Sequence, residues 1–407
     1  MERTITITPR KLSGSLEVPP SKSMAHRLLI CASLASGRSV VDNLSLSEDI
    51  SATIGAMRAL GSSIGVSKAT ATCDGSAIFH TEKALNIDCR ESGSTIRFLI
   101  PVALAGGRTC TFTGSGRLME RPLEPYFELC GQDGITVKKE NGAVTFDGKL
   151  RGGTYRLAGN ISSQFITGLL FALPLVGADS RILLTTPLES AGYVDMTIQA
   201  LAAFGIEIEN ADNAEFRIRG GQRYQPHNCA VEGDYSQAAF FFVANALGSR
   251  VALTGLREDS LQGDREILPI IKKMGTPLAG MEIDVSQIPD LVPVLAVLAT
   301  QAECVTRLTN AKRLRIKESD RLHTTTQELR KLGAEIVEHE DELIITGKTN
   351  LTGGVTCAHN DHRIAMALAI AATACSGAVT IQGAECVRKS YGNFWEDYQR
   401  LGGCIRG

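Results

Sequence analysis

The stretch Ala203-Phe204-Gly205-Ile206-Glu207-Ile208 combines the end of an amphipathic run, a glycine and an alternating segment. A glycine directly after an amphipathic run is typical of a helix C-terminus, because glycine enters the left-handed backbone region with little steric cost. The alternation that follows indicates a strand. This helix–glycine–strand pattern occurs six times, and its glycines are Gly61, Gly131, Gly205, Gly275, Gly333 and Gly402.

Successive glycines of this set are 70, 74, 70, 58 and 69 residues apart. Two further sequence patterns recur at similar distances before each glycine. A β-rich segment that ends in a turn residue lies 17 to 23 residues before each glycine, and the six segments are Ser39–Asn43, Arg108–Gly114, Arg181–Thr186, Arg250–Gly255, Cys304–Asn310 and Ala378–Gly383. A helical pattern precedes each segment, near Ser23–Ser36, Ser94–Ala105, Gln164–Val176, Tyr235–Leu247, Ile288–Thr300 and His362–Ser376. We therefore expect an α/β fold with six copies of one module.

The module length bears on how the six copies are arranged. Known solenoid repeats have periods of about 20–50 residues, shorter than the roughly 70 residues of this module. Two pseudo-symmetric domains of three modules are therefore favoured, and one continuous solenoid is the alternative.

The composition is that of a globular protein, with 43% hydrophobic residues and a formal net charge of −2. It excludes a mainly disordered chain and offers no excess of positive charge for nonspecific nucleic-acid binding. The most apolar stretch, Leu291–Thr300, is too short to span a bilayer. The eleven cysteines include no Cys-x-x-Cys pair, so we expect reduced thiols in the cytoplasm, with neither disulfides nor a zinc site.

Cationic and small polar residues recur where helices are expected to begin. Lys22, Ser23 and Arg27 follow Pro19-Pro20-Ser21, and similar clusters occur at Ser94–Arg97, Arg121-Pro122, Ser162–Gln164, Lys317–Arg321, Asn360–Arg363 and Lys389-Ser390. Helix N-termini attract anions, and arginine forks match carboxylate and phosphate groups. Helix capping with a surface salt bridge explains any single cluster better. Together the clusters predict a small polyanionic substrate.

Acidic residues lie among these cations. Asp290 stands at one expected helix start, and Glu318 and Asp320 lie between Lys317 and Arg321. Such acids serve either as structural partners of the cations or as general acids and bases. No histidine pair has metal-ligand spacing and no nucleotide-binding glycine motif is present, so we expect neither a metal nor a cofactor.

In combination and order, six motifs resemble those of the 5-enolpyruvylshikimate-3-phosphate synthase family along essentially the whole chain. They are Val18–Arg27, Met119–Pro122, Ser162–Gln164, Gln287–Asp290, Arg315–Leu322 and Asn360–Arg363. The resemblance implies two pseudo-threefold domains of three βαβαββ units each, an inside-out α/β barrel arrangement. The implied domains are residues 1–17 with 232–407, and residues 18–231, with the active site in the cleft between them.

The resemblance also implies the reaction. The enolpyruvyl group of phosphoenolpyruvate passes to the 5-hydroxyl of shikimate 3-phosphate through a tetrahedral intermediate, and phosphate is released. The expected partners are these two small molecules, without nucleic acid, membrane, cofactor or metal, and we expect a monomer whose domains close on the substrates.

The family motifs assign the site residues. The catalytic residues are expected to be Lys22, Asp290 as base and Glu318 as acid, although the division of roles among the three stays open. The phosphoenolpyruvate contacts are expected to be Lys22, Gly93, Arg121, Gln164, Arg321, Arg363 and Lys389. The shikimate 3-phosphate contacts are expected to be Lys22, Ser23, Arg27, Ser162, Ser163, Gln164, Ser190, Tyr193, Asp290 and Lys317. Because Gly93 leaves the phosphoenolpyruvate pocket uncrowded, we expect glyphosate to compete with that substrate.

Two positions depart from the usual family pattern. Glu91 brings a carboxylate near the expected anion site and should weaken binding unless it points away or pairs, for instance with Arg97. Arg313 replaces an asparagine and either adds a phosphate contact or faces solvent.

Two other functions remain as alternatives. The sister transferase that acts on UDP-N-acetylglucosamine usually has a reactive cysteine before the Arg-Pro pair, whereas residues 113–120 contain none and Cys110 lies in the preceding strand. A nonenzymatic repeat scaffold would not require acids and cations interleaved at several helix starts, and an RNA-processing relative should show a basic stripe and a nucleotide site, neither of which is visible in the sequence.

Overall fold

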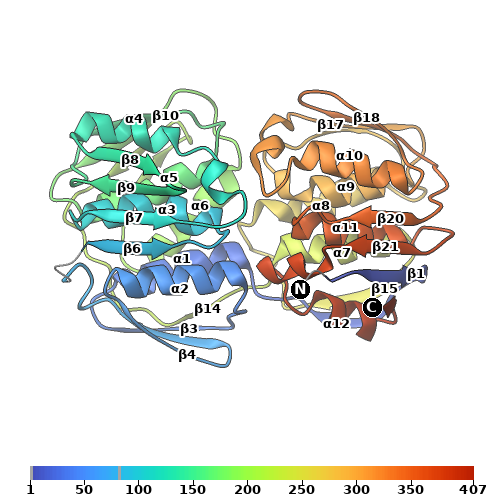
Figure 1. Ribbon diagram of the computed structural model, residues 1–407, viewed down its shortest axis with the longest axis horizontal. Helices are drawn as coiled ribbons and strands as arrows, with labels where there is room; N and C mark the ends of the chain where they lie inside the picture. Colours follow the sequence, from blue (N-terminus) through green and yellow to red (C-terminus); the bar gives the residue numbers. More distant parts are fainter. Residues whose placement is uncertain (1–2, 81–83) are drawn as a thin grey trace. The chain divides into compact units, whose positions relative to one another are not determined.

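The computed structural model describes residues 3–80 and 84–407, which form two compact units (Figure 1). The continuous unit is Pro20–Glu232. The split unit joins the residues up to Pro19 with Gly233–Gly407. Each unit has its own cluster of buried apolar side chains, so each has its own hydrophobic core.

The continuous unit contains three four-stranded sheets with the orders β14-β3-β5-β4, β6-β7-β9-β8 and β10-β11-β13-β12. In each sheet the first pair of strands is parallel and the other pairs are antiparallel. The strands are β3 (Arg38–Asp42), β4 (Ser63–Ser67), β5 (Thr70–Asp74), β6 (Leu85–Asp88), β7 (Cys110–Thr113), β8 (Thr136–Glu140), β9 (Ala143–Asp147), β10 (Thr154–Leu157), β11 (Ser180–Leu184), β12 (Ile208–Ala211), β13 (Glu215–Ile218) and β14 (Cys229–Ala230).

Three helices of this unit, α1 (Lys22–Leu34), α3 (Gly93–Ala105) and α5 (Ser163–Ala172), are buried along most of their length. They pack with α2 (Glu48–Ala59) and α6 (Ala191–Ala203), while α4 (Glu124–Asp133) lies against β8 and β10. A serine caps the N-terminus of each buried helix, since Ser21, Ser92 and Ser162 accept a hydrogen bond from a backbone N–H of the first turn.

The split unit repeats the same sheet twice, as β16-β17-β19-β18 and β20-β21-β1-β22, and adds a two-stranded parallel sheet, β15-β2. The strands are β1 (Ile5–Thr8), β2 (Ser13–Glu17), β15 (Arg250–Thr254), β16 (Glu282–Asp284), β17 (Val305–Thr309), β18 (Glu335–Glu338), β19 (Leu343–Thr346), β20 (Gly354–Cys357), β21 (Val379–Gln382) and β22 (Cys404–Arg406). The expected six-module α/β fold is therefore confirmed, with one module reduced.

Three buried helices of the split unit, α7 (Tyr235–Ala246), α9 (Val292–Ala299) and α11 (His362–Ala372), pack against one another. The others are α8 (Ile267–Met274), α10 (Arg321–Lys331) and α12 (Phe394–Arg400). In the split unit, the side chains that cap helices are those of aspartates. Asp234, Asp320 and Asp361 cap α7, α10 and α11. At α10 and α11 these carboxylates stand at helix starts that also carry an arginine, Arg321 and Arg363.

One expected helix end is wrong. Gly131 lies inside α4, which continues to Asp133 and ends at Gly134, whose φ is +69°. Because Gly134 supplies the left-handed conformation three residues later, the helix can continue through Gly131. The other five glycines have positive φ, as a helix C-terminus requires.

None of the helices in the part of the chain that the structure describes is long and apolar enough to cross a membrane.

Candidate active site

Six predicted site residues lie in the split unit at or just before helix starts. Asp290 is in the short helix η4 (Pro289–Leu291), which leads into α9. Lys317 and Glu318 lie between η5 (Lys312–Ile316) and α10, which begins at Arg321. Arg363 is the second residue of α11, and Lys389 ends η6 (Ala384–Lys389).

Three cations of this cluster surround the Asp290 carboxylate. Its Oδ1 lies 2.8 Å from Nη1 of Arg321 and its Oδ2 lies 2.8 Å from Nη2 of Arg363. The Lys317 ammonium lies 3.7 Å from Oδ1. Burial alone would raise the pKa of Asp290, but the surrounding cations, chiefly Arg363, outweigh it and hold this pKa well below its usual range.

Arg321 joins the two predicted acids. Besides binding Asp290, its guanidinium lies 2.7 Å from Oε2 of Glu318, and its side chain is 1% exposed. Burial would lower the pKa of Arg321, yet the adjacent carboxylates, first that of Asp361, raise the pKa above its usual value. Arg321 therefore stays charged and links the proposed acid and base through one rigid group.

Asp361 is a site residue whose role was not predicted from the sequence. Its Oδ2 lies 2.8 Å from Nε of Arg321 and accepts a hydrogen bond from Ser319, while its Oδ1 caps α11 at the Arg363 N–H. The carboxylate is completely buried. An aspartate directly before an expected helix was the available signal, but the sequence could not reveal its partner 40 residues away.

Lys317 and Lys389 have different surroundings. Burial, together with the nearby charges of Arg313 and Arg321, lowers the pKa of Lys317 to about 8 against the opposing effect of Asp290. The Lys389 ammonium donates to the Asn360 carbonyl at 2.7 Å. Lys317 is therefore a cation that titrates near neutral pH.

Arg27 is the most enclosed cation among the predicted residues of the continuous unit. Its guanidinium donates to the carbonyls of Ser23 at 2.6 Å and Tyr193 at 2.7 Å, and to Thr197 Oγ1 at 2.9 Å. It also lies over the ring of Phe98, 5.3 Å from the centroid. Burial lowers the pKa of Arg27 to about 10, so it remains charged at neutral pH.

Lys22, the other predicted cation on α1, lies closer to solvent. Its ammonium is 2.9 Å from Oδ2 of Asp49, and its side chain is 15% exposed. The charge of Lys22 is therefore balanced by Asp49 before any anionic ligand binds.

Gly93 opens α3 directly beneath Arg121. A Cβ placed on Gly93 would lie 2.6 Å from Nη1 of Arg121, so a side chain there would force the guanidinium to move. Gln164 contacts the first turns of α3. Its Nε2 donates to Ser94 Oγ at 3.0 Å and its Oε1 accepts from Arg97 at 2.8 Å. The structure thus brings Gln164 to the start of α3.

The remaining predicted residues of this unit lie at the starts of α5 and α6. Ser162 caps α5 and Ser163 is buried in its first turn. Ser190 caps α6 with φ +57°, an uncommon conformation for a residue that is not glycine, and it is almost completely buried. Tyr193 presents its carbonyl to Arg27.

The two departures from the family pattern are both placed by the structure. Glu91 packs against the turn at Gly116, where an added Cβ would lie 2.7 Å from the Glu91 carboxyl carbon. Arg97 contacts Gln164, the Pro122 carbonyl and the Phe165 ring. Arg313 is 9% exposed and donates to the Ser286 carbonyl, so it does not simply face solvent.

A chain of hydroxyl groups supports the start of α3. Thr53 Oγ1 lies 2.7 Å from His26 Nδ1 and 2.7 Å from Thr95 Oγ1, and Thr95 donates to the capping Ser92 Oγ at 2.7 Å. Burial, with the nearby charges of Lys22 and Arg27, holds the pKa of His26 well below its usual range. A neutral histidine therefore links α1 and α2 to the N-terminus of α3.

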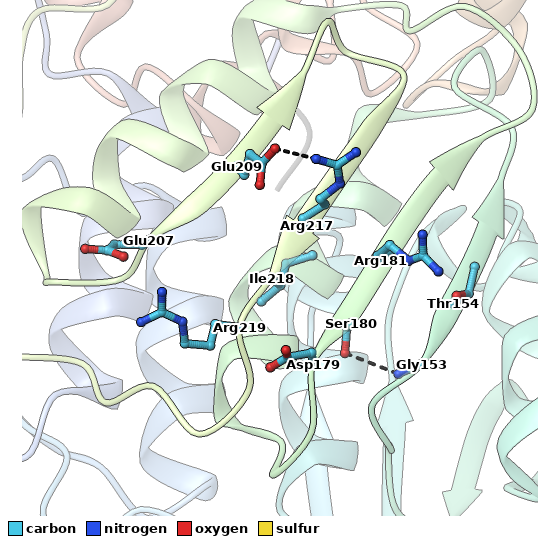
Figure 2. Close-up of a pocket in the computed structure, with 10 residues that line it drawn as sticks. All are labelled: Gly153, Thr154, Asp179, Ser180, Arg181, Glu207, Glu209, Arg217, Ile218 and Arg219. Carbon is cyan, nitrogen blue, oxygen red and sulfur yellow. Dashed lines mark hydrogen bonds and ion pairs between the residues drawn. The ribbon is translucent and has the colours of Figure 1, made fainter.

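A surface groove of about 620 Å³ lies on the β10-β11-β13-β12 sheet and contains none of the predicted residues (Figure 2). Its Arg217 is paired with Glu209 at 2.6 Å and with the neighbouring Glu215 at 3.0 Å, and the side chains of Arg217 and Glu209 are 49% and 62% exposed. This arrangement is a solvated ion-pair surface. Cys110, which precedes the Arg-Pro pair in the sequence, is buried, and burial raises the pKa of its thiol to about 12.

Among the described residues, no group of three or more His, Cys, Asp or Glu side chains is arranged to hold a metal ion.

The fold is similar to that of the enolpyruvyl transferase NikO from Streptomyces tendae. That structure covers 100% of this chain and matches it with a TM-score of 0.79 at 19% identity, which bears on the fold alone. An EPSP synthase from Acinetobacter baumannii has a TM-score of 0.82 at 28% identity, with 100% of both chains covered.

The sequence comparisons define the family. A model described as EPSP synthase (3-phosphoshikimate 1-carboxyvinyltransferase) matches residues 7–398. Proteins called 3-phosphoshikimate 1-carboxyvinyltransferase from Clostridium kluyveri and Clostridioides difficile are 49% and 47% identical, with 98% and 99% of this chain and 98% of each relative covered. The chain belongs to the EPSP synthase family, and the family and the enzyme class expected from its motifs are confirmed.

Proposed function

We propose that this chain transfers the enolpyruvyl group of phosphoenolpyruvate to the 5-hydroxyl of shikimate 3-phosphate and releases inorganic phosphate. The observation that carries the proposal is the bridge from Asp290 through Arg321 to Glu318, with contacts of 2.8 and 2.7 Å. A buried guanidinium that holds two carboxylates supports an acid and a base that act on one pair of substrates.

Both substrates carry phosphate and carboxylate groups, which match the helix-start cations in charge and geometry. We propose that residues of both units contact them. The proposed phosphoenolpyruvate contacts are Lys22, Gly93, Arg121, Gln164, Arg321, Arg363 and Lys389. The proposed shikimate 3-phosphate contacts are Lys22, Ser23, Arg27, Ser162, Ser163, Gln164, Ser190, Tyr193, Asp290 and Lys317.

The proposed chemistry requires one proton donor and one proton acceptor. Glu318 donates a proton to the methylene carbon of phosphoenolpyruvate while the 5-hydroxyl oxygen bonds to C2 and its proton passes to Asp290. The C2–O bond to phosphate then breaks, the methyl group of the intermediate returns a proton to Glu318 as the carbon–carbon double bond forms again, and Asp290 gives its proton to the departing phosphate. Lys22 supplies positive charge to the phosphate that leaves.

Substrate binding would change the strength of the base. In the free chain, the cations hold the pKa of Asp290 well below its usual range, which makes it a weak proton acceptor. Substrate anions compete with Asp290 for Arg321 and Arg363, and a weaker hold by those cations raises its pKa. The proposed base is therefore strengthened when the substrates are bound.

Phosphate release from phosphoenolpyruvate tests the function, with shikimate 3-phosphate or UDP-N-acetylglucosamine as the acceptor. We expect release only with shikimate 3-phosphate, and a loss of about 10²–10⁴-fold in kcat for Glu318→Gln. The matched control is Glu340→Gln, because Glu340 is an exposed carboxylate of the same unit that pairs with Lys312 at 2.7 Å. Release only with the nucleotide sugar would move the substrate to the sister enzyme, and release with neither would overturn the proposal.

We also propose that the enzyme works in the cytoplasm as a monomer. The eleven cysteines, all of them free, support a reducing compartment, because disulfides are rare there. Sedimentation equilibrium at micromolar concentration tests the oligomeric state, and a mass near twice 43.5 kDa would contradict it.

A further inference from the structure

Glu328 is a completely buried carboxylate in the third turn of α10 that plays no part in the proposed chemistry. Its oxygens accept hydrogen bonds from Lys331 Nζ at 2.8 and 2.9 Å, from His359 Nε2 at 2.7 Å and from the Cys357 N–H at 2.9 Å. Burial would raise the pKa of Glu328, but these donors outweigh burial and lower it. Glu328 is therefore an ionised group with a complete set of donors.

Two of these donors belong to the turn between β20 and α11. His359 and Asn360 lie side by side in the left-handed region, with φ values of +50° and +54°. Such a conformation costs on the order of 1 kcal/mol or more for each residue that is not glycine, so the surroundings must hold it. Glu328 holds the turn at its backbone, through Cys357, and at its side chain, through His359.

The same turn presents two groups to the proposed phosphoenolpyruvate cations. The Asn360 carbonyl accepts from Lys389 Nζ at 2.7 Å. The next residue, Asp361, binds Arg321 Nε at 2.8 Å and caps α11 at Arg363. Glu328 is thus connected to Lys389 through His359 and the adjacent Asn360. It is connected to Arg321 through the same turn and Asp361.

We propose that Glu328 is a positioning residue for phosphoenolpyruvate, which sets the Cys357–Asn360 turn and thereby the places of Lys389 and Arg321. The inference rests on the proposed function, because it takes these two cations as phosphoenolpyruvate contacts. It predicts that the main effect falls on phosphoenolpyruvate, since the Glu328 carboxylate binds Lys331, His359 and the Cys357 N–H and acts on the site through the turn that carries Asn360.

Glu328→Gln tests the inference with little change in shape. Glutamine offers one acceptor oxygen, so its amide nitrogen would face either the Cys357 N–H or the His359 N–H. Losing one hydrogen bond to a charged group corresponds to about tenfold. We expect the KM for phosphoenolpyruvate to rise about tenfold, while the KM for shikimate 3-phosphate stays within about twofold to threefold, because Asp290 is also held by Arg363 and Lys317.

Two further variants separate positioning from a general loss of structure. His359→Leu removes a donor at a partly exposed position and should reproduce the selective rise in KM, whereas His359→Gln keeps a donor and should restore part of the affinity. Glu342→Gln is the matched control, because Glu342 pairs with Arg307 at 2.7 Å on the sheet of the same unit. It should leave both KM values unchanged.

The outcomes distinguish this inference from the proposed function. If the parent chain fails to use shikimate 3-phosphate, the proposed function fails. If the parent is active, but His359→Leu and a folded Glu328→Gln leave the KM for phosphoenolpyruvate unchanged, the inference alone is overturned. A fall in kcat or in active fraction without a change in KM would assign Glu328 a purely structural role. If Glu328→Gln does not fold, the two His359 variants decide between these results.

Discussion

The Oδ2 atom of Asp290 lies 2.8 Å from Nη2 of Arg363, which is 73 residues away in the sequence. This contact ties the start of α9 to the start of α11. It also means that one carboxylate, predicted as the base, is balanced by cations before any substrate arrives.

Replacing this carboxylate should affect both activity and acid stability. Asp290→Asn removes the proton acceptor and one of the carboxylates that balance Arg321 and Arg363, so we expect kcat to fall about 10²–10⁴-fold. The folded pKa of Asp290 is depressed, so its contribution to stability is present above its unfolded pKa near 3.9 and is lost as pH falls through the folded pKa. Urea unfolding should show a stability gap between parent and variant at pH 7 that narrows below about pH 4.

A gap that stayed constant from pH 7 to the lowest pH at which both chains remain folded would contradict the electrostatic account of Asp290. Asp341→Asn is a suitable control, because Asp341 accepts only from the backbone at the exposed start of η5.

Lys317 should make binding of shikimate 3-phosphate pH-dependent. Its pKa is lowered to about 8, so above that pH the ammonium loses its proton and its attraction for phosphate. We expect the KM for shikimate 3-phosphate to rise as pH increases above about 8, and Lys317→Arg to remove this rise because arginine stays charged. Initial rates from pH 6.5 to 9.5 measure it, and an identical profile in both chains would contradict the assignment.

Gly93→Ala should weaken phosphoenolpyruvate binding by displacing Arg121. The added Cβ would lie 2.6 Å from Nη1 of Arg121, which is too close for contact without movement of the guanidinium. We expect the KM for phosphoenolpyruvate to rise by about tenfold, the effect of one weakened charged hydrogen bond.

In the parent chain glyphosate should compete with phosphoenolpyruvate, and full activity in millimolar glyphosate at low phosphoenolpyruvate would contradict this.

A control for the glycine variant is available within the same unit. Gly131→Ala lies in α4, where an added Cβ meets no atom within 4 Å, so it should leave both KM values unchanged.

Thr53→Val should destabilise the continuous unit through the hydroxyl chain at α3. Valine keeps the shape but breaks the hydrogen bonds to His26 and Thr95, which are both buried. We expect a loss of about 1–3 kcal/mol in the free energy of unfolding. Thr111→Val is the control, because Thr111 pairs with Thr145 at 2.9 Å on a partly exposed sheet face. Equal losses in the two variants, measured by urea unfolding, would contradict a special role for the chain.

The repeated architecture could be predicted because its signals are local. A glycine after a helix and alternation within a strand are set by neighbouring residues, and five of the six glycines end their helices as expected. The helix end predicted at Gly131 was wrong because a second glycine, Gly134, follows within one turn and ends the helix instead.

The contacts around the candidate site could not be predicted in the same way. Asp361 with Arg321 and Glu328 with His359 join residues 40 and 31 positions apart, so only the packed helices bring them together. A hydroxyl chain such as Thr53 to Thr95 leaves no pattern in the sequence, because threonine is common on any helix. The cations and the neighbouring acids Asp290 and Glu318 could be found in the sequence, but the supporting role of Asp361 could not.

The central place of β1 in its sheet has a consequence for how the chain is synthesised. β1 pairs with β21 on one side and β22 on the other, and β2 pairs with β15, so the earliest strands lack partners until much later residues have left the ribosome. Pro20–Glu232 is continuous and can fold as soon as it has emerged. β1 and β2 therefore lack their sheet partners throughout that time, and β22 completes the β1 sheet only after β21 has emerged.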